Sequence, residues 1–149
     1  MTLYSASDHL KPTTEPPDQW ALGLQLTNDP RAPGIARSTL KAAMVNFGLG
    51  SDVTQTALLL ASELVTNGVK HSDGPVFIRA TARKGDLRVS VWDSDPELPE
   101  PLTVGTEEPF GRGLLLVELL SRAWGRYSFG SESRGGAAPG KVVWFELGS

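Results

Sequence analysis

Hydrophobic and polar residues alternate along this chain with two different periods, and each period predicts a different kind of element. In WALGLQL, residues 20–26, leucines recur at every second position, which is the period of a strand. The same period recurs in PVFIRATAR (75–83) and LRVSVWD (87–93), joined by KGD, a short glycine-containing turn typical of antiparallel hairpins. The pattern therefore predicts a strand near residue 20 and a hairpin further along.

Helical periodicity fills the region between that first strand and the hairpin. TNDP is a typical helix start, because Asn28 or Asp29 can cap free backbone N–H groups while Pro30 fits the first helical position. This first helix is predicted to end near Phe47. GLGSD then separates it from a second helix.

The second helix is predicted from about Val53 to His71, with Ser51 or Asp52 as its cap. After a proline-dense stretch, GRGLLLVELLSRAW (111–124) has the composition of an apolar helix that opens on glycines. The chain is therefore expected to contain three helices.

Two final strands, GRYSF (125–129) and KVVWFEL (141–147), are expected on either side of a glycine-rich loop. The order strand, helix, helix, hairpin, helix, hairpin predicts an α/β fold: a two-layer α/β sandwich with three helices on one face of a mixed, mostly antiparallel sheet. Residues 1–19 hold three of the eleven prolines and few large apolar groups, so they are expected to form a flexible leader. Residues 20–149 are expected to form a single domain.

Composition narrows the classes of function. The net charge of -3 and the scattered basic residues give no electrostatic basis for a nucleic acid or an anionic membrane as the main partner. The absence of cysteine excludes disulfides and thiolate metal sites. The N-terminus lacks the features of a secretory signal, and no stretch approaches the ~20 apolar residues of a membrane span. The expectation is a cytoplasmic protein with no membrane partner and no direct nucleic-acid partner.

Polar side chains gather near the end of the second predicted helix, in SELVTNGVKHS. Glu63, Asn67, Lys70 and His71 share one side of that helix, and Glu63 and Asn67 are neighbours because they are four residues apart. A carboxylate can act as a general base, and an amide oxygen is a neutral ligand suited to Mg²⁺. An ordinary solvated face is the alternative, but flanking leucines favour a lined cleft.

Asp93, in VSVWDSD, falls on the strand face that is predicted to point into the core. A carboxylate there needs a donor, because burying it unsatisfied would be costly. Strand parity leaves two donors open: a backbone N–H of the next turn, or an amino group of a ligand.

Gly111 and Gly113 bracket the start of the third predicted helix. Free N–H groups and the positive end of the helix dipole favour a phosphate there, and glycines let it approach closely. A tight turn into a core helix is the alternative. Lys141 is expected to be a solvated residue at the start of a strand, with contact to a phosphate as the less favoured role.

Together and in this order, these motifs resemble the ATP-binding fold of the GHKL superfamily, which includes gyrase-type ATPases and histidine-kinase catalytic domains. ELVTNGVKH looks like its N-box, VWDSD like its adenine-contacting G1 region, and GRGL like its G2 box. The chain is most similar to the small anti-sigma-factor serine/threonine kinases of bacterial partner-switching systems, through SELVTNGVKHS, GRGLLLVELL and GKVVWFEL. The likeness spans about residues 20–147 and implies a Bergerat-type ATP-binding domain.

This resemblance implies a role for each motif. Asn67 would ligate Mg²⁺ that bridges the ATP phosphates, Glu63 would be the base toward the attacking hydroxyl, and Asp93 would accept a hydrogen bond from the adenine amino group. The other residues that would bind the nucleotide are Lys70, His71, Gly111, Arg112, Gly113 and Leu114. The implied chemistry is phosphoryl transfer from ATP to a serine or threonine of an antagonist protein.

The implied partners are a sigma factor, an anti-sigma-factor antagonist, or both, and dimeric relatives imply a homodimer. Two departures from the superfamily are visible. Pro96 and Glu97 occupy the positions where much of the superfamily has Gly-x-Gly. Residues 96–110, which correspond to the ATP lid, contain four prolines and therefore predict a short, stiff lid. The altered G1 region motivates an alternative: a non-catalytic protein-binding module of the same fold, which either keeps ATP as a structural ligand or has lost ATP binding. A detached histidine-kinase catalytic domain fits less well, because His9 lies in the proline-rich leader.

Overall fold

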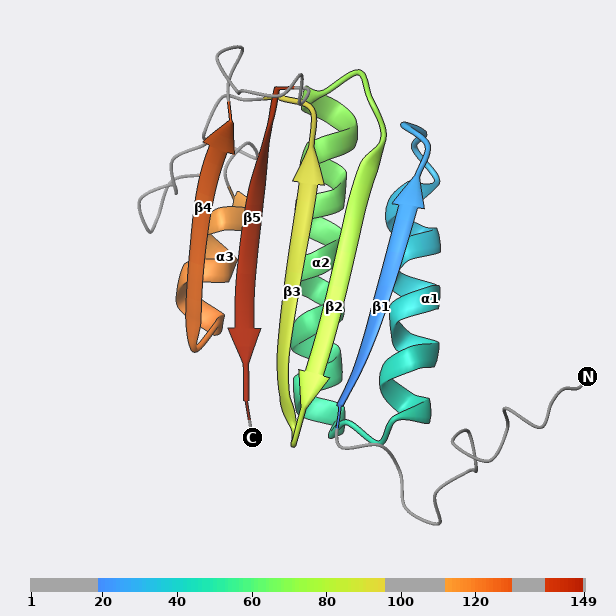
Figure 1. Ribbon diagram of the computed structural model, residues 1–149, viewed down its shortest axis with the longest axis vertical. Coiled ribbons are helices and arrows are strands. Elements are labelled where there is room, and N and C mark those ends of the chain that lie inside the picture. The colour runs from blue at the N-terminus through green and yellow to red at the C-terminus, as the bar shows by residue number, and fades with distance from the viewer. Residues whose placement is uncertain (1–18, 96–111, 130–138, 149) are drawn as a thin grey trace, which may run out of the picture.

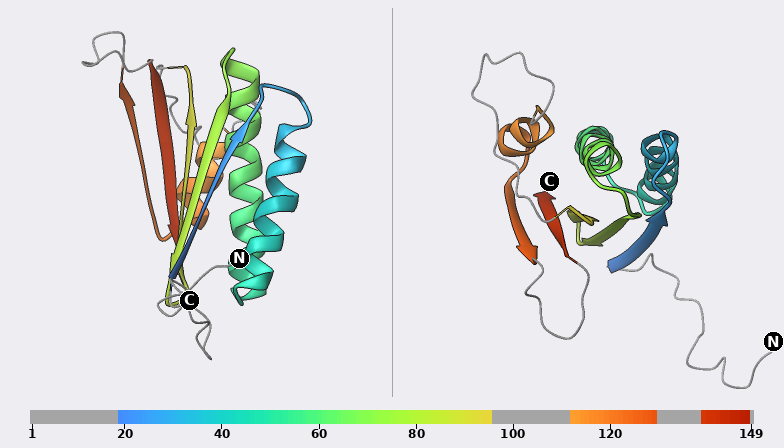
Figure 2. Two further views of the ribbon diagram at one scale, coloured as in Figure 1. Left: turned by 45° about the vertical axis from the view of Figure 1, so that its right-hand side comes forward. Right: turned by 90° about the horizontal axis from the view of Figure 1, so that it is seen from above.

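The computed structural model describes residues 19–95, 112–129 and 139–148 (Figure 1). In these ranges the chain forms an antiparallel sheet with strand order β1-β2-β3-β5-β4, and three helices cover one of its faces. Figure 2 shows the helices side by side, with α2 between α1 and α3. The predicted two-layer sandwich is confirmed, and every strand pair is antiparallel. The strands are β1 (Gln19–Leu26), β2 (Val76–Arg83), β3 (Asp86–Asp93), β4 (Ala123–Phe129) and β5 (Gly140–Leu147), and the helices are α1 (Ala32–Asn46), α2 (Ser51–His71) and α3 (Arg112–Leu120).

The core lies between the helices and one face of the sheet. The alternation of β2 and β3 places one set of side chains in this core, as the sequence pattern predicts. Their two-residue turn uses left-handed backbone at Lys84 (φ 52) and Gly85 (φ 86), the geometry that matches the twist of a hairpin. In α1 the core side chains recur every four residues and form one continuous apolar stripe. The members of this stripe are Ala32, Ala36, Leu40 and Met44.

The start of α1 differs from the prediction. The helix begins at Ala32, so Pro33 rather than Pro30 occupies the first turn. Asp29 instead closes the preceding turn, because its carboxylate accepts from the backbone N–H and the guanidinium of Arg31. These hydrogen bonds lower the pKa of Asp29 and raise that of Arg31. Asn28 is not a cap either, because its amide donates to the carbonyls of the loop after α2.

Other boundaries also move. Gly50 is the N-cap residue of α2, without a side-chain cap hydrogen bond, so neither predicted cap residue has that role. The third helix ends at Leu120 rather than near residue 124, because Trp124 pairs with Phe145 as part of β4. β1 begins at Gln19, one residue before the predicted domain boundary. None of the helices in the described ranges combines the length and apolarity needed to cross a membrane.

We expect Leu40→Ala to destabilise the fold by about 2–5 kcal/mol, because Leu40 is fully buried and its truncation leaves a cavity beneath α1. The matched control is Val45→Ala on the same helix, where the side chain is 61% exposed. That control should change the free energy of unfolding by no more than about 0.5 kcal/mol. Urea denaturation measures both values, and equal losses would contradict this account of the core.

Candidate functional site

The polar side of α2 meets the beginning of α3 at a glycine. A Cβ atom added to Gly113 would lie 3.0 Å from Cβ of Glu63 and 3.1 Å from Nδ2 of Asn67. Both polar residues are half-buried, and Gly113 is buried. The missing side chain therefore lets the two helices touch at this point, and two motifs that are far apart in the sequence lie together.

A second glycine brings α2 down onto the sheet. Gly68 is buried, and a Cβ atom there would lie 3.0 Å from Cγ2 of Val76 and 3.3 Å from Cβ of Asp93. Because Gly68 directly follows Asn67 in the helix, the end of β3 lies against the part of α2 that carries the polar group. The structure thus brings α2, α3 and the end of β3 together as one candidate site.

Asp93 forms a buried ion pair with Lys141. Its Oδ1 lies 2.9 Å from Nζ of Lys141, and their side chains are only 5% and 7% exposed. The two residues are cross-strand partners in β3 and β5. The backbone N–H of Asp95 donates to the same oxygen at 2.9 Å, so the local-donor alternative for Asp93 is confirmed. The Lys141 ammonium supplies a further donor that the sequence did not predict.

The expectation of a solvated Lys141 is wrong. The residue is 6% exposed, because strand alternation places it on the same face as Val143 and Phe145. Its ammonium also lies 3.4 Å from the carbonyl oxygen and 3.8 Å from the carboxylate of Asp95. The parity of KVVWFEL could have revealed this orientation, but lysines are rarely buried without a partner and the partner was not visible in the sequence.

The second carboxylate oxygen of Asp93, Oδ2, differs from Oδ1 in its hydrogen bonding. No group in the described ranges donates a hydrogen bond to Oδ2, which faces Gly68 at 3.5 Å from the position of an added Cβ. Two donors hold Oδ1, so the carboxylate is fixed in orientation and Oδ2 keeps its accepting capacity. Such an oxygen can accept from an amino group of a ligand.

The remaining predicted residues have varied positions. Lys70 and His71 are exposed in the last turn of α2, where a positive charge interacts favourably with the helix dipole. The side chain of Leu114 is fully buried in the core, so only its backbone is suited to contact a ligand. Arg112 is the first residue of α3, and Gly111 lies outside the described residues. The predicted lid, 96–110, lies outside them as well.

Comparison with known proteins places this arrangement in a family. Residues 26–145, which include all three elements of the site, match the histidine kinase-like ATPase domain. This chain belongs to the histidine kinase-like ATPase domain family. No curated protein matches it.

Among solved structures, the ATPase domain is similar in fold to the crystal structure of the RsbU and RsbW domains of Rv1364c from Mycobacterium tuberculosis. The TM-score is 0.63 and the sequence identity is 19%, over 85% of this chain and 31% of that chain. The ATPase domain therefore corresponds to less than a third of the length of that chain, and the likeness shows the fold alone.

We expect Lys141→Met to destabilise the ATPase domain by about 3–5 kcal/mol, because it leaves the Asp93 carboxylate buried without its ionic partner. Combining it with Asp93→Asn should recover part of this loss, since the uncompensated charge is then gone. Arg122→Met is the matched control: its ion pair with Asp86 has side chains 51% and 54% exposed, so the loss should stay below about 1 kcal/mol. Chemical denaturation of the wild type and the three variants checks this, and a Lys141→Met loss no larger than that of the control would refute it.

Proposed function

We propose that this ATPase domain is a cytoplasmic, ATP-binding regulatory protein that acts as an anti-sigma-factor-like serine/threonine protein kinase on an antagonist protein. The observation that carries the proposal is the contact of Gly113 in α3 with both Glu63 and Asn67 in α2. In this contact, a carboxylate suited to act as a base and an amide oxygen suited to bind Mg²⁺ lie beside the glycine in the first turn of α3. The family membership and the resemblance to the partner-switching kinases support it.

The residues present fit Mg²⁺ and ATP in their donor chemistry. The Asn67 amide oxygen is a hard neutral ligand, and Mg²⁺ commonly takes one or two protein oxygens together with substrate phosphates. The start of α3, at Arg112 and Gly113, offers backbone N–H groups to a phosphate. Oδ2 of Asp93 would accept from the adenine amino group. Bound Mg²⁺ would supply charge neutralisation between the phosphates.

Glu63 has the role of base in this proposal. Its carboxylate would accept the proton of the serine or threonine hydroxyl as that oxygen bonds to the γ-phosphorus. The bond between the γ-phosphorus and the bridging oxygen breaks, and ADP leaves with the electron pair. Positioning and charge neutralisation supply most of the rate in such reactions, so the close α2–α3 contact matters more than reactivity of the carboxylate itself.

A second candidate is a non-catalytic module of the same fold that binds a sigma factor or an antagonist and keeps ATP as a structural ligand or has lost it. The sequence departure at Pro96 and Glu97 favours it, since much of the superfamily has Gly-x-Gly there. In both candidates the partner is a protein of the sigma-factor regulatory system, and a homodimer is part of the proposal.

We expect the wild-type domain to bind ATP with a clear dependence on Mg²⁺, and Asn67→Ala to reduce the Mg²⁺-dependent part of the affinity at least tenfold, about 1.4 kcal/mol. The reason is that Asn67 is the proposed protein ligand of the metal. Isothermal titration calorimetry with and without Mg²⁺ measures this. Gln55→Ala, at an exposed position on the same helix, is the control and should bind like the wild type. Absence of wild-type binding at millimolar ATP would rule out the proposal.

Glu63→Ala separates the two candidates. If the domain is a kinase, this variant should retain ATP binding while transfer to the co-purifying antagonist falls by about 10²–10⁴-fold, the usual contribution of a general base. Labelled ATP followed by phosphoserine analysis measures the transfer. A stable complex with no transfer by the wild type would favour the non-catalytic module instead.

A further inference from the structure

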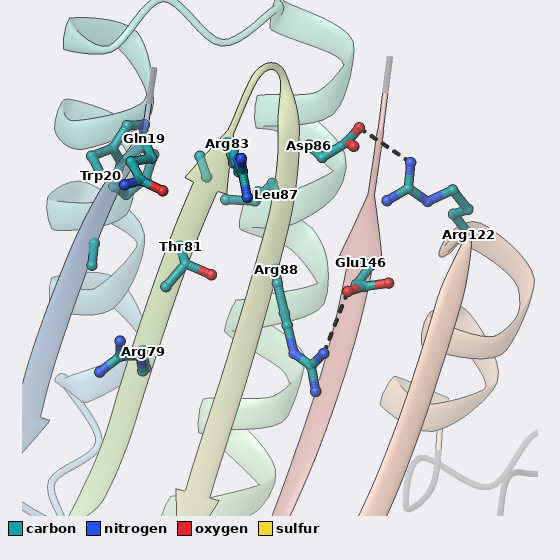
Figure 3. A pocket seen from close by; sticks show the side chains of 12 residues that line it. Gln19, Trp20, Arg79, Thr81, Arg83, Asp86, Leu87, Arg88, Arg122 and Glu146 are labelled. Carbon is teal, nitrogen blue, oxygen red and sulfur yellow. Dashed lines mark hydrogen bonds and ion pairs between the residues drawn. The ribbon is translucent and has the colours of Figure 1, made fainter. Parts of the chain in front are cut away.

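A pocket of about 520 Å³ lies on the sheet face that points away from the helices (Figure 3). Arginines from β2, β3 and the segment before β4 line it, and Figure 3 shows the helices behind the sheet. We call this pocket the arginine groove. Its four arginines are Arg79, Arg83, Arg88 and Arg122. None of the residues proposed to bind ATP lines it.

Only two of the four arginines in the groove form ion pairs with described residues. Arg88 lies 3.4 Å from the Glu146 carboxylate, and Arg122 lies 3.1 Å from that of Asp86. Arg79 and Arg83, in contrast, form no ion pair or hydrogen bond with a residue of the described ranges. Within the described ranges, β2 therefore carries two cations that form no ion pair, in a chain whose net charge is -3.

The residues of β1 beside Arg79 and Thr81 are small. Gly23 and Ala21 of β1 pair with Arg79 and Thr81, and a Cβ atom at Gly23 would meet nothing within 4 Å. Arg79 and Arg83 are four positions apart on one strand, which separates their Cα atoms by about 13 Å. An extended chain has the same rise, so its residues i and i+4 match this spacing.

We propose that the arginine groove binds an acidic, extended segment of a partner protein, with carboxylates of residues i and i+4 against Arg79 and Arg83. Planar guanidinium groups bind carboxylates with two parallel hydrogen bonds, and opposite charge speeds encounter. A nucleic acid fits less well, because Asp86 and Glu146 each pair with one of the other two arginines, so the groove offers two cations at a fixed spacing rather than a continuous basic surface.

The arginine groove lies on the opposite face of the sheet from the proposed ATP site. Its residues Arg79 and Arg83 alternate along β2 with buried residues that face the helices. A partner in the groove can therefore be held whether or not the nucleotide site is filled. The groove and the proposed ATP site share no residue, so a variant of one can lose binding while the other keeps it.

Fluorescence anisotropy with a labelled octaglutamate peptide tests the proposal, with an octaglutamine peptide of equal length as the reference. We expect the wild type to prefer octaglutamate, and each of Arg79→Gln and Arg83→Gln to weaken that binding by about 5–10-fold. Higher salt should weaken it too, because screening shortens the reach of surface charge. Lys41→Gln removes an exposed charge from α1 and is the matched control, expected to bind like the wild type.

Four results would overturn the proposal. They are equal affinity for the two peptides, arginine variants that bind like the wild type, stronger binding of a single-stranded oligonucleotide of the same charge, or a wild-type dimer that the arginine variants dissociate in sedimentation. The last result would make the groove an interface between copies of this chain. Thermal unfolding of each variant verifies that it is folded, and loss of ATP binding by any variant would not bear on the groove.

Discussion

The candidate site depends on how closely α2 packs against its neighbours. Its apolar stripe holds it in the centre of the helical layer, in contact with α1, α3 and the sheet. At Gly68 the missing side chain allows contact with Asp93, and Gly113 allows the same approach from α3. Added side chains at these two positions would force the elements apart. Close packing through glycine thus fixes the distance between the polar groups of α2 and the end of β3.

The ion pair of Asp93 and Lys141 adds a constraint of another kind. Burying two charges is costly, and their mutual attraction repays that cost only when the geometry is good and other hydrogen bonds complete it. Here Oδ1 of Asp93 receives both the ammonium and a backbone N–H, so these conditions hold on that side of the carboxylate. The pair therefore orients the carboxylate and joins two central strands at the edge of the site.

The two faces of the sheet have different chemistry because strand side chains alternate. The covered face carries the apolar core and the buried ion pair, whereas the open face carries the arginine groove and, toward the other end of the strands, aromatic contacts of Trp92 with Phe77 and Phe129. One set of five strands thus supports a candidate site among the helices and a separate charged surface behind it.

The sequence by itself determined the elements, their order and the two-layer architecture, because hydrophobic periodicity is a local property of the chain. It also placed Glu63 and Asn67 on one helix side and Asp93 on the inner strand face. Only the tertiary structure decided the partner of Asp93, the role of Gly68 and the end of α3. Lys141 is 48 residues from Asp93, and Trp124 leaves the helical pattern because it pairs with β5. Contacts of this kind arise from packing between distant segments, which no local pattern records.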